Sequence, residues 1–151
     1  MKIYLAADHA GFELKEKIEQ WLKEWGYEYE DLGPHEYDKD DDYPKLISPA
    51  ALKVAEDPVN NRAIVLGGSG QGEAIVCNRK EGVFATVYAA REFDQELVEK
   101  MRQHNNSNVL SLGARFVPEE DAKQVVKTWL ETPFAGEERH VRRIAQIDQY
   151  Q

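Results

Sequence analysis

The amino-acid sequence predicts an α/β fold in which helices cover both faces of a five-stranded parallel sheet. Short β-branched or aromatic runs alternate with stretches of helical periodicity along the whole chain. Repeated β-α units of this length favour a parallel sheet covered on both sides. The sequence contains no internal repeat and no linker-like stretch, so residues 1–151 are expected to form a single domain.

The first half of the chain predicts two strands and two helices. Residues 2–7, KIYLAA, form a short apolar run that is typical of a buried strand. After Gly11, apolar residues recur at helical spacing until Gly26, which ends the predicted helix. Residues 27–32 alternate in polarity and predict a second strand, and a polar loop then leads to a helix over 43–56.

The second half continues the alternation. Residues 62–68 predict the third strand, residues 81–88 contain the fourth, and a helix that starts near Gly70 connects them. Residues 91–103 have a helical composition, and 108–113 form the fifth predicted strand. The last two helices are expected after Pro118, with an apolar face of Ala122, Val125, Val126, Trp129 and Leu130, and over the charged segment 137–149.

The composition excludes several classes of protein. A formal charge of −9, from 28 acidic and 19 basic residues, argues against non-specific nucleic-acid binding. The single cysteine, Cys77, rules out an intrachain disulfide and favours a reducing compartment. Asp8 and His9 interrupt the N-terminal apolar run, which is too short for a signal peptide, and no run approaches a membrane span. We therefore expect a cytoplasmic protein with no membrane or nucleic-acid partner.

The ends of the predicted strands locate a candidate site. In parallel α/β sheets, ligands bind at the carboxyl ends of the strands. Here those ends are followed by polar or glycine-rich sequences: ADHAG (7–11), GGSGQGE (67–73), VYAAR (87–91) and LGAR (112–115). The functional residues are therefore expected along one edge of the sheet.

The glycine-rich loop LGGSGQGEA (66–74) matches none of the common nucleotide or nucleophile motifs. No Lys-Ser/Thr pair follows its last glycine, and Gln71 stands where a nucleophile elbow needs its second glycine. Gly68, Gly70 and Gly72 also lack the G-x-G-x-x-G spacing of dinucleotide sites. Two interpretations remain: a tight turn with a serine cap, or a loop whose backbone N–H groups bind a phosphate or an oxyanion.

The acidic residues and histidines of these segments also have two interpretations each. Glu73 in the first helical turn would be favoured by the helix dipole by about 0.3–1 kcal/mol, or it would be a general base beside an oxyanion hole. Asp8 and His9 would be a helix cap followed by an exposed histidine, or ligands of a hydroxylated molecule. On chain order His104 lies far from this edge, so it is either a surface residue or the contribution of a second subunit.

Basic and acidic clusters elsewhere are less specific. Arg139 and Arg143 share one helical face, which suits a phosphate dianion but equally suits surface ion pairs. The run DKDDD (38–42) lacks the glycine and glutamate of a calcium loop, so a solvated loop is expected. Cys77, four residues after Glu73, is expected to be a packed structural cysteine.

Several segments together resemble a known family over nearly the whole chain. They are MKIYLAADHAGFELKEKI, DYPKLI, GGSGQGEAIVCNR, REFDQELVEKMRQHNNSNVLSLGAR and TPFAGEERHVRRI. These are similar to the type B ribose-5-phosphate isomerases, which form one sugar-phosphate isomerase family with the galactose-6-phosphate isomerase subunits. The resemblance implies a Rossmann-like three-layer αβα sandwich, no metal or organic cofactor, and a homodimer, alone or paired into a tetramer, with active sites between subunits.

The resemblance also implies roles for individual residues in aldose–ketose isomerisation through a cis-enediolate. Asp8, His9 and Tyr43 would contact the sugar, and the loop around Gly68, Ser69 and Gly70 would form the anion hole. The partner subunit would supply His104, which assists ring opening, and Asn105. The phosphate would be bound by Arg115 and by Arg139 and Arg143 of the C-terminal helix 137–149, which would also contribute to the dimer.

One departure from the family pattern selects the base. Many members have a catalytic cysteine where this sequence has Gly67, and Cys77 is too far along the chain to replace it. A second subgroup has a GGSGxGE loop and uses the glutamate, which assigns the role to Glu73. The expected reaction is the interconversion of ribose 5-phosphate and ribulose 5-phosphate. The alternatives are another sugar phosphate, such as allose or galactose 6-phosphate or an unusual pentose phosphate, and a non-catalytic sugar-phosphate binding module.

Overall fold

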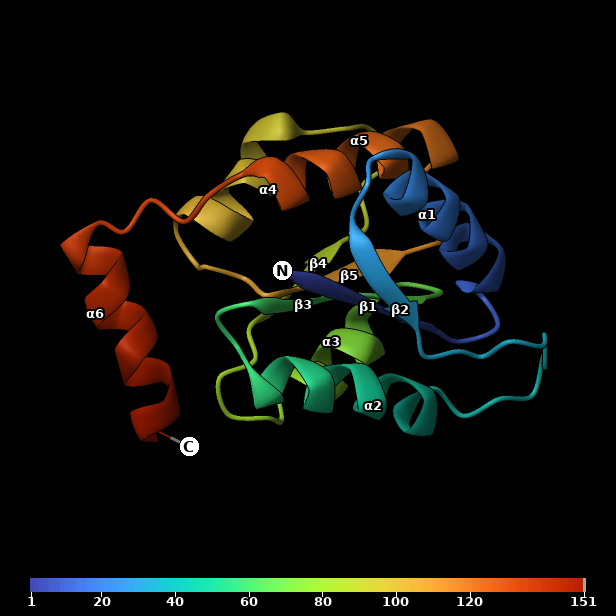
Figure 1. Ribbon diagram of the computed structural model, residues 1–151, viewed down its shortest axis with the longest axis horizontal. Coiled ribbons are helices and arrows are strands. Elements are labelled where there is room, and N and C mark those ends of the chain that lie inside the picture. Colours follow the sequence, from blue (N-terminus) through green and yellow to red (C-terminus); the bar gives the residue numbers. More distant parts are fainter. Residues whose placement is uncertain (151) are drawn as a thin grey trace.

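The computed structural model describes residues 1–150 and confirms the α/β architecture, with one sheet between two layers of helices (Figure 1). All five strands are parallel, in the spatial order β2-β1-β3-β5-β4. Their bounds are β1 Lys2–Ala7, β2 Glu28–Asp31, β3 Asn61–Gly67, β4 Ala85–Tyr88 and β5 Val109–Gly113.

The helices form a layer on each face of the sheet. One face is covered by α1 (Phe12–Glu24), α4 (Gln95–Gln103) and α5 (Glu119–Glu131), and the other by α2 (Tyr43–Glu56) and α3 (Gln71–Cys77) (Figure 1). Side chains alternate between the two layers, since Ile3 and Leu5 join the first core and Tyr4 and Ala6 the second. The predicted order of elements and the three-layer sandwich are thus confirmed.

The bounds differ from expectation mainly in the fourth β-α unit. The helix expected over 91–103 begins only at Gln95, because the side chain of Asp94 caps it by accepting a hydrogen bond from the backbone N–H of Leu97 at 3.0 Å. The fourth strand occupies only the end of 81–88, because the preceding residues form a turn in which Val83 N–H donates to the Lys80 carbonyl.

The connections create a crevice between β1 and β3. The chain leaves β1 through α1 on one face and leaves β3 through α3 on the other face, so the segments after these two adjacent strands diverge (Figure 1). A point where the strand order reverses is where open α/β sheets bind ligands. The topology therefore confines the site search to the segments that follow β1 and β3.

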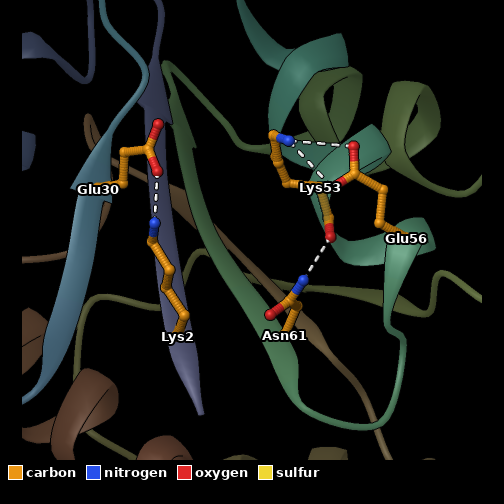
Figure 2. Close-up of polar contacts among 5 residues, drawn as sticks. All are labelled: Lys2, Glu30, Lys53, Glu56 and Asn61. Atoms are coloured by element: carbon orange, nitrogen blue, oxygen red, sulfur yellow. Dashed lines mark hydrogen bonds and ion pairs between the residues drawn. The ribbon is translucent and has the colours of Figure 1, made fainter.

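Polar contacts at the solvent-exposed side of the first three strands are of an ordinary surface kind (Figure 2). Lys2 Nζ donates to Glu30 at 2.6 Å across β1 and β2. The Asn61 side chain donates to the Lys53 carbonyl at 2.8 Å and ties β3 to α2, and Lys53 itself pairs with Glu56. Exposed ion pairs of this type add little stability, so these contacts mark register and not function.

The C-terminal helix α6 (Glu138–Ile147) extends away from both layers, and a short 3-10 turn, Asp148–Tyr150, follows it (Figure 1). His140 is its only buried residue, whereas Val141 and Ile147 are about half exposed, at 48% and 50%. Within residues 1–150, no helix combines the length and the apolar character needed to cross a membrane.

Candidate active site

The segment after β1 places Asp8 and His9 at the crevice. Asp8 is bound to β3 through its backbone N–H, which donates to the Leu66 carbonyl at 3.0 Å. Its Oδ1 accepts hydrogen bonds from the N–H groups of Ala10 and Gly11, at 2.8 and 3.1 Å, just before α1 begins. Asp8 therefore forms the turn before α1 but does not cap the helix, because the N-cap is Gly11 and has no side-chain hydrogen bond. Its fixed position also places Asp8 on the wall of the crevice.

The glycine-rich loop after β3 is fixed by β5. Gly70 has a φ of +76°, a conformation that favours glycine, and it is the N-cap of α3. Ser111 of β5, fully buried, donates from its hydroxyl to the Gly70 carbonyl at 2.6 Å. Ser69 Oγ accepts from the N–H of Gln71 at 3.3 Å, so the serine supports the turn, but it is not the helix cap, which is Gly70. The loop is therefore rigidly held while its start faces the crevice.

Glu73 lies in the first turn of α3 and is buried, with 4% of its surface exposed. Burial raises the pKa of the Glu73 carboxyl above its usual value, and the negative charges of Asp8 and Asp41 raise it further. A carboxylate of raised pKa in a pocket is a stronger base than a surface glutamate, as proton abstraction from carbon requires.

The carboxyl group of Glu73 fills the space where residue 67 would carry a side chain. A Cβ atom built on Gly67 would overlap the carboxyl carbon and both carboxyl oxygens of Glu73. Glycine at position 67 is therefore a steric requirement of this Glu73 conformation. A larger residue at position 67 and the observed carboxyl position exclude each other.

A pocket of about 510 Å³ opens at this crevice and brings most of the predicted site residues together. It draws on the ends of β1, β3 and β5 and on the start of α2. The predicted residues that line it are Asp8, His9, Tyr43, Gly68, Ser69, Glu73 and Arg115, and Ala10, Gly72 and Phe116 line it as well. Gly70, the remaining loop position, directly precedes α3.

Four predicted residues lie outside this pocket. His104 and Asn105 form the turn between α4 and β5, at the amino end of the parallel sheet. Arg139 and Arg143 are exposed on α6, where Arg139 pairs with Glu137 at 2.9 Å, as the surface interpretation expects. One chain by itself therefore does not bring these four residues to Glu73.

The turn and α6 are in contact with each other. The rings of His104 and His140 stack with their centroids 4.3 Å apart. Burial and the neighbouring His104 lower the pKa of His140 below its usual value. Asn105 lines a second hollow, of about 290 Å³, together with Ile147 of α6. The four outlying residues thus form their own group on the far side of the molecule.

The acidic run before α2 contains a site residue that the sequence analysis missed. Asp38, Asp40 and Asp42 are exposed, as expected of a solvated loop, but the Asp41 side chain is only 6% exposed. Its Oδ1 lies 2.8 Å from Nδ1 of His9. The solvated-loop prediction is wrong for this residue because tertiary packing, which composition does not report, turns one aspartate of the run inward.

Asp8, His9 and Asp41 have the donor types of a metal site, and one ligand atom of each lies within 4.8 Å of the others. The 2.8 Å contact between His9 and Asp41 is a hydrogen bond, which already engages Nδ1 of His9 and Oδ1 of Asp41. Cys77 is buried, and burial together with the charge of Glu73 raises the pKa of its thiol to about 12. It remains a packed thiol, as predicted.

Comparison with known proteins gives the family. Residues 3–147 match the protein family described as Ribose/Galactose Isomerase. The chain belongs to this family. Ribose-5-phosphate isomerase B of Mycobacterium tuberculosis is 38% identical over 151 residues, which is all of this chain and 90% of the relative. The family resemblance inferred from the sequence is therefore confirmed.

Solved structures of the Ribose/Galactose Isomerase family share the fold closely. Ribose-5-phosphate isomerase B from Mycoplasma genitalium with bound ribulose-5-phosphate has a TM-score of 0.92 at 35% identity and covers 99% of this chain and 95% of its own. The enzyme from Clostridium thermocellum has a TM-score of 0.90 at 35% identity, with coverages of 99% and 97%.

Proposed function

We propose that this protein is an aldose–ketose isomerase that interconverts ribose 5-phosphate and ribulose 5-phosphate in the cytoplasm, without a metal or an organic cofactor. The observation that supports the substrate most strongly is the full-length similarity to ribose-5-phosphate isomerases B, one of which was solved with ribulose-5-phosphate bound. The pocket independently supports the chemistry, because it presents the buried carboxylate of Glu73 beside the glycine-rich loop.

Glu73 is the base in the proposed mechanism. It removes the proton from C2 of the open-chain aldose, and the electron pair moves onto the carbonyl oxygen at C1 to give a cis-enediolate. The same carboxylic acid then returns the proton to C1, while the hydroxyl proton of O2 passes to O1 and the oxygen at C2 becomes the carbonyl of the ketose. Adjacent carbons need only one base, which agrees with the single glutamate in this part of the pocket.

The glycine-rich loop stabilises the enediolate. Backbone N–H groups around Gly68, Ser69 and Gly70 are fixed by Ser111 before the substrate arrives, so they need no reorganisation when charge develops. Glu73 is neutral at that moment, since it has just accepted the proton. The acidic residue and the developing oxyanion therefore never carry their charges together.

The sugar and its phosphate are held by separate groups. Asp8, His9 and Tyr43 contact the hydroxyl groups of the sugar from the wall of the pocket. Arg115, whose backbone N–H donates to the Gly68 carbonyl at 3.1 Å, binds the phosphate from the same chain. A guanidinium group suits this role because it donates two parallel hydrogen bonds to phosphate oxygens.

A second copy of the chain completes the site. His104, which assists ring opening, and Asn105 come from the partner subunit, together with the phosphate ligands Arg139 and Arg143. The exposed apolar residues of α6, Val141 and Ile147, support a homodimer, because a helix with an uncovered apolar face is typical of an interface. The dimer acts alone or pairs into a tetramer.

A panel of substrates tests the function. We expect kcat/KM to be highest for ribose 5-phosphate, and lower for allose 6-phosphate and galactose 6-phosphate. We also expect solvent deuterium at C2 of the aldose phosphate recovered from D2O, since Glu73 exchanges its proton with solvent. A preference for a hexose phosphate would show that the assigned substrate is wrong. Binding without turnover and without deuterium uptake would show that the protein is a sugar-phosphate binding module and not an isomerase.

A further inference from the structure

The hydrogen bond between Asp41 and His9 links a loop to the pocket wall. Asp41 directly precedes the exposed N-cap residue of α2, and His9 follows β1, so the contact joins two segments 32 residues apart. The same loop contributes Tyr37, whose ring lies edge-on to the His9 ring with centroids 6.4 Å apart. Two side chains of one loop therefore fix the orientation of the imidazole.

Because Asp41 is buried, the compensation of its negative charge depends on the protonation state of His9. Among the described residues, Oδ2 of Asp41 is buried without a hydrogen-bond partner, so the carboxylate depends on its Oδ1 contact for compensation. A buried carboxylate is costly unless a cation or several donors offset it. A doubly protonated His9 supplies both a charge and a donor at 2.8 Å.

We propose that Asp41 is a positioning residue of the isomerase: it accepts the hydrogen bond from Nδ1 of His9 and thereby fixes the ring so that Nε2 faces an oxygen of the sugar. With Nδ1 engaged, Nε2 is the only ring nitrogen left for a ligand in the pocket. This inference rests on the proposed function.

The charges around His9 agree with this assignment. The hydrogen bond with Asp41 raises the pKa of His9, and the negative charge of Asp8 on the β1 side adds to the effect. Partial burial and the positive charge of Arg115, which follows β5, act in the opposite direction, and the net result is a raised pKa. The two carboxylates therefore outweigh the arginine.

Histidine NMR combined with kinetics tests the proposal. The chain has four histidines, so the side-chain nitrogen signals of His9 can be assigned by comparison with a His9→Gln variant. In Asp41→Asn we expect the pKa of His9 to fall, and kcat to fall by about 10- to 100-fold, as when a functional histidine loses its carboxylate partner. Asp40→Asn removes the same charge from an exposed position of the loop and is expected to change neither quantity.

A double variant separates positioning from folding. If Asp41 acts through His9, adding Asp41→Asn to His9→Gln should lower kcat little further. An equal loss in both backgrounds, or an unchanged pKa of His9 in Asp41→Asn, would overturn the proposal. A wild-type protein without turnover would instead refute the proposed function, and the NMR titration would still decide whether Asp41 controls His9.

Discussion

The two groups of predicted site residues are held in different ways. The pocket residues are anchored by the ends of buried strands, and Glu73 itself is 4% exposed. Arg139 and Arg143 lie exposed on α6, a helix that extends away from the sheet (Figure 1). In the proposed enzyme, one chain therefore preorganises the groups for proton transfer, whereas the proposed phosphate ligands of α6 come from a second chain.

The difference follows from the topology of the chain. Residues that follow β1, β3 and β5 must meet at one edge, because parallel strands all end there. His104 precedes β5 and is therefore at the opposite end, however its side chain turns. Three kinds of experiment test this difference: removing or moving the base, finding which chain supplies each group, and measuring the stability cost of each group.

The largest effect is expected from removing the base. Glu73→Gln keeps the shape of the side chain but removes its ability to accept a proton, and loss of a positioned general base lowers kcat by about 10²–10⁴-fold. Steady-state kinetics with ribose 5-phosphate measure the change, and circular dichroism checks that the fold is intact. Full activity in a folded Glu73→Gln protein would refute the assignment of the base.

A smaller loss is expected when the base is only displaced. Gly67→Ala places a Cβ atom in the space of the Glu73 carboxyl group, which must then move. A misplacement of this size lowers kcat by roughly 10²-fold. The loss should disappear in the Glu73→Gln background, where no base remains to be displaced. Additive losses in the double variant would show that Gly67 acts independently of Glu73.

Mixing inactive variants tests whether residues of two chains form one active site. If Glu73 and His104 of different chains share a site, a mixed dimer of Glu73→Gln and His104→Gln contains one intact site. An equal mixture should then recover about a quarter of wild-type activity on ribose 5-phosphate, because half of the dimers are mixed.

The matched control pairs Glu73→Gln with Asp8→Asn. Both residues line the pocket of the same chain, so every site in a mixed dimer remains defective. Recovery is expected only for the mixture with His104→Gln. Equal recovery in both mixtures, or recovery in neither, would contradict a site that is shared between subunits.

The sequence predicted the features that depend on local patterns. Helical periodicity and strand ends placed Asp8, the glycine-rich loop and Arg115 at one edge, and the pocket confirms this grouping. Asp41 was missed because its neighbours in the acidic run have the same chemistry, and only tertiary packing separates it from them. The steric exclusion between Gly67 and Glu73 likewise depends on the distance between a strand end and a helix turn, which no spacing rule supplies.

The smallest predicted effect concerns stability, where only the group around Glu73 should show a change in Tm. Because burial raises the pKa of Glu73 in the folded state, its carboxylate favours folding less above that pKa than a neutral side chain would. Glu73→Gln should therefore raise the Tm at pH 7, by about 2–4 °C for each kcal/mol gained. The gain should vanish below the ordinary glutamate pKa of 4.5, where the carboxyl is protonated in both folded and unfolded states.

Arg143→Gln provides the contrast for this measurement. Arg143 is exposed on α6, and surface substitutions usually change stability by less than about 0.5 kcal/mol. The Tm of Arg143→Gln should therefore stay close to that of the wild type at every pH. Thermal unfolding of the three proteins from about pH 4 to about pH 8 decides the point, because a buried carboxylate lowers stability only above its ordinary pKa. If the Glu73→Gln variant is no more stable than the wild type at pH 7, the charge of the buried carboxylate is fully compensated in the folded protein. The pocket then holds its base without destabilising the fold.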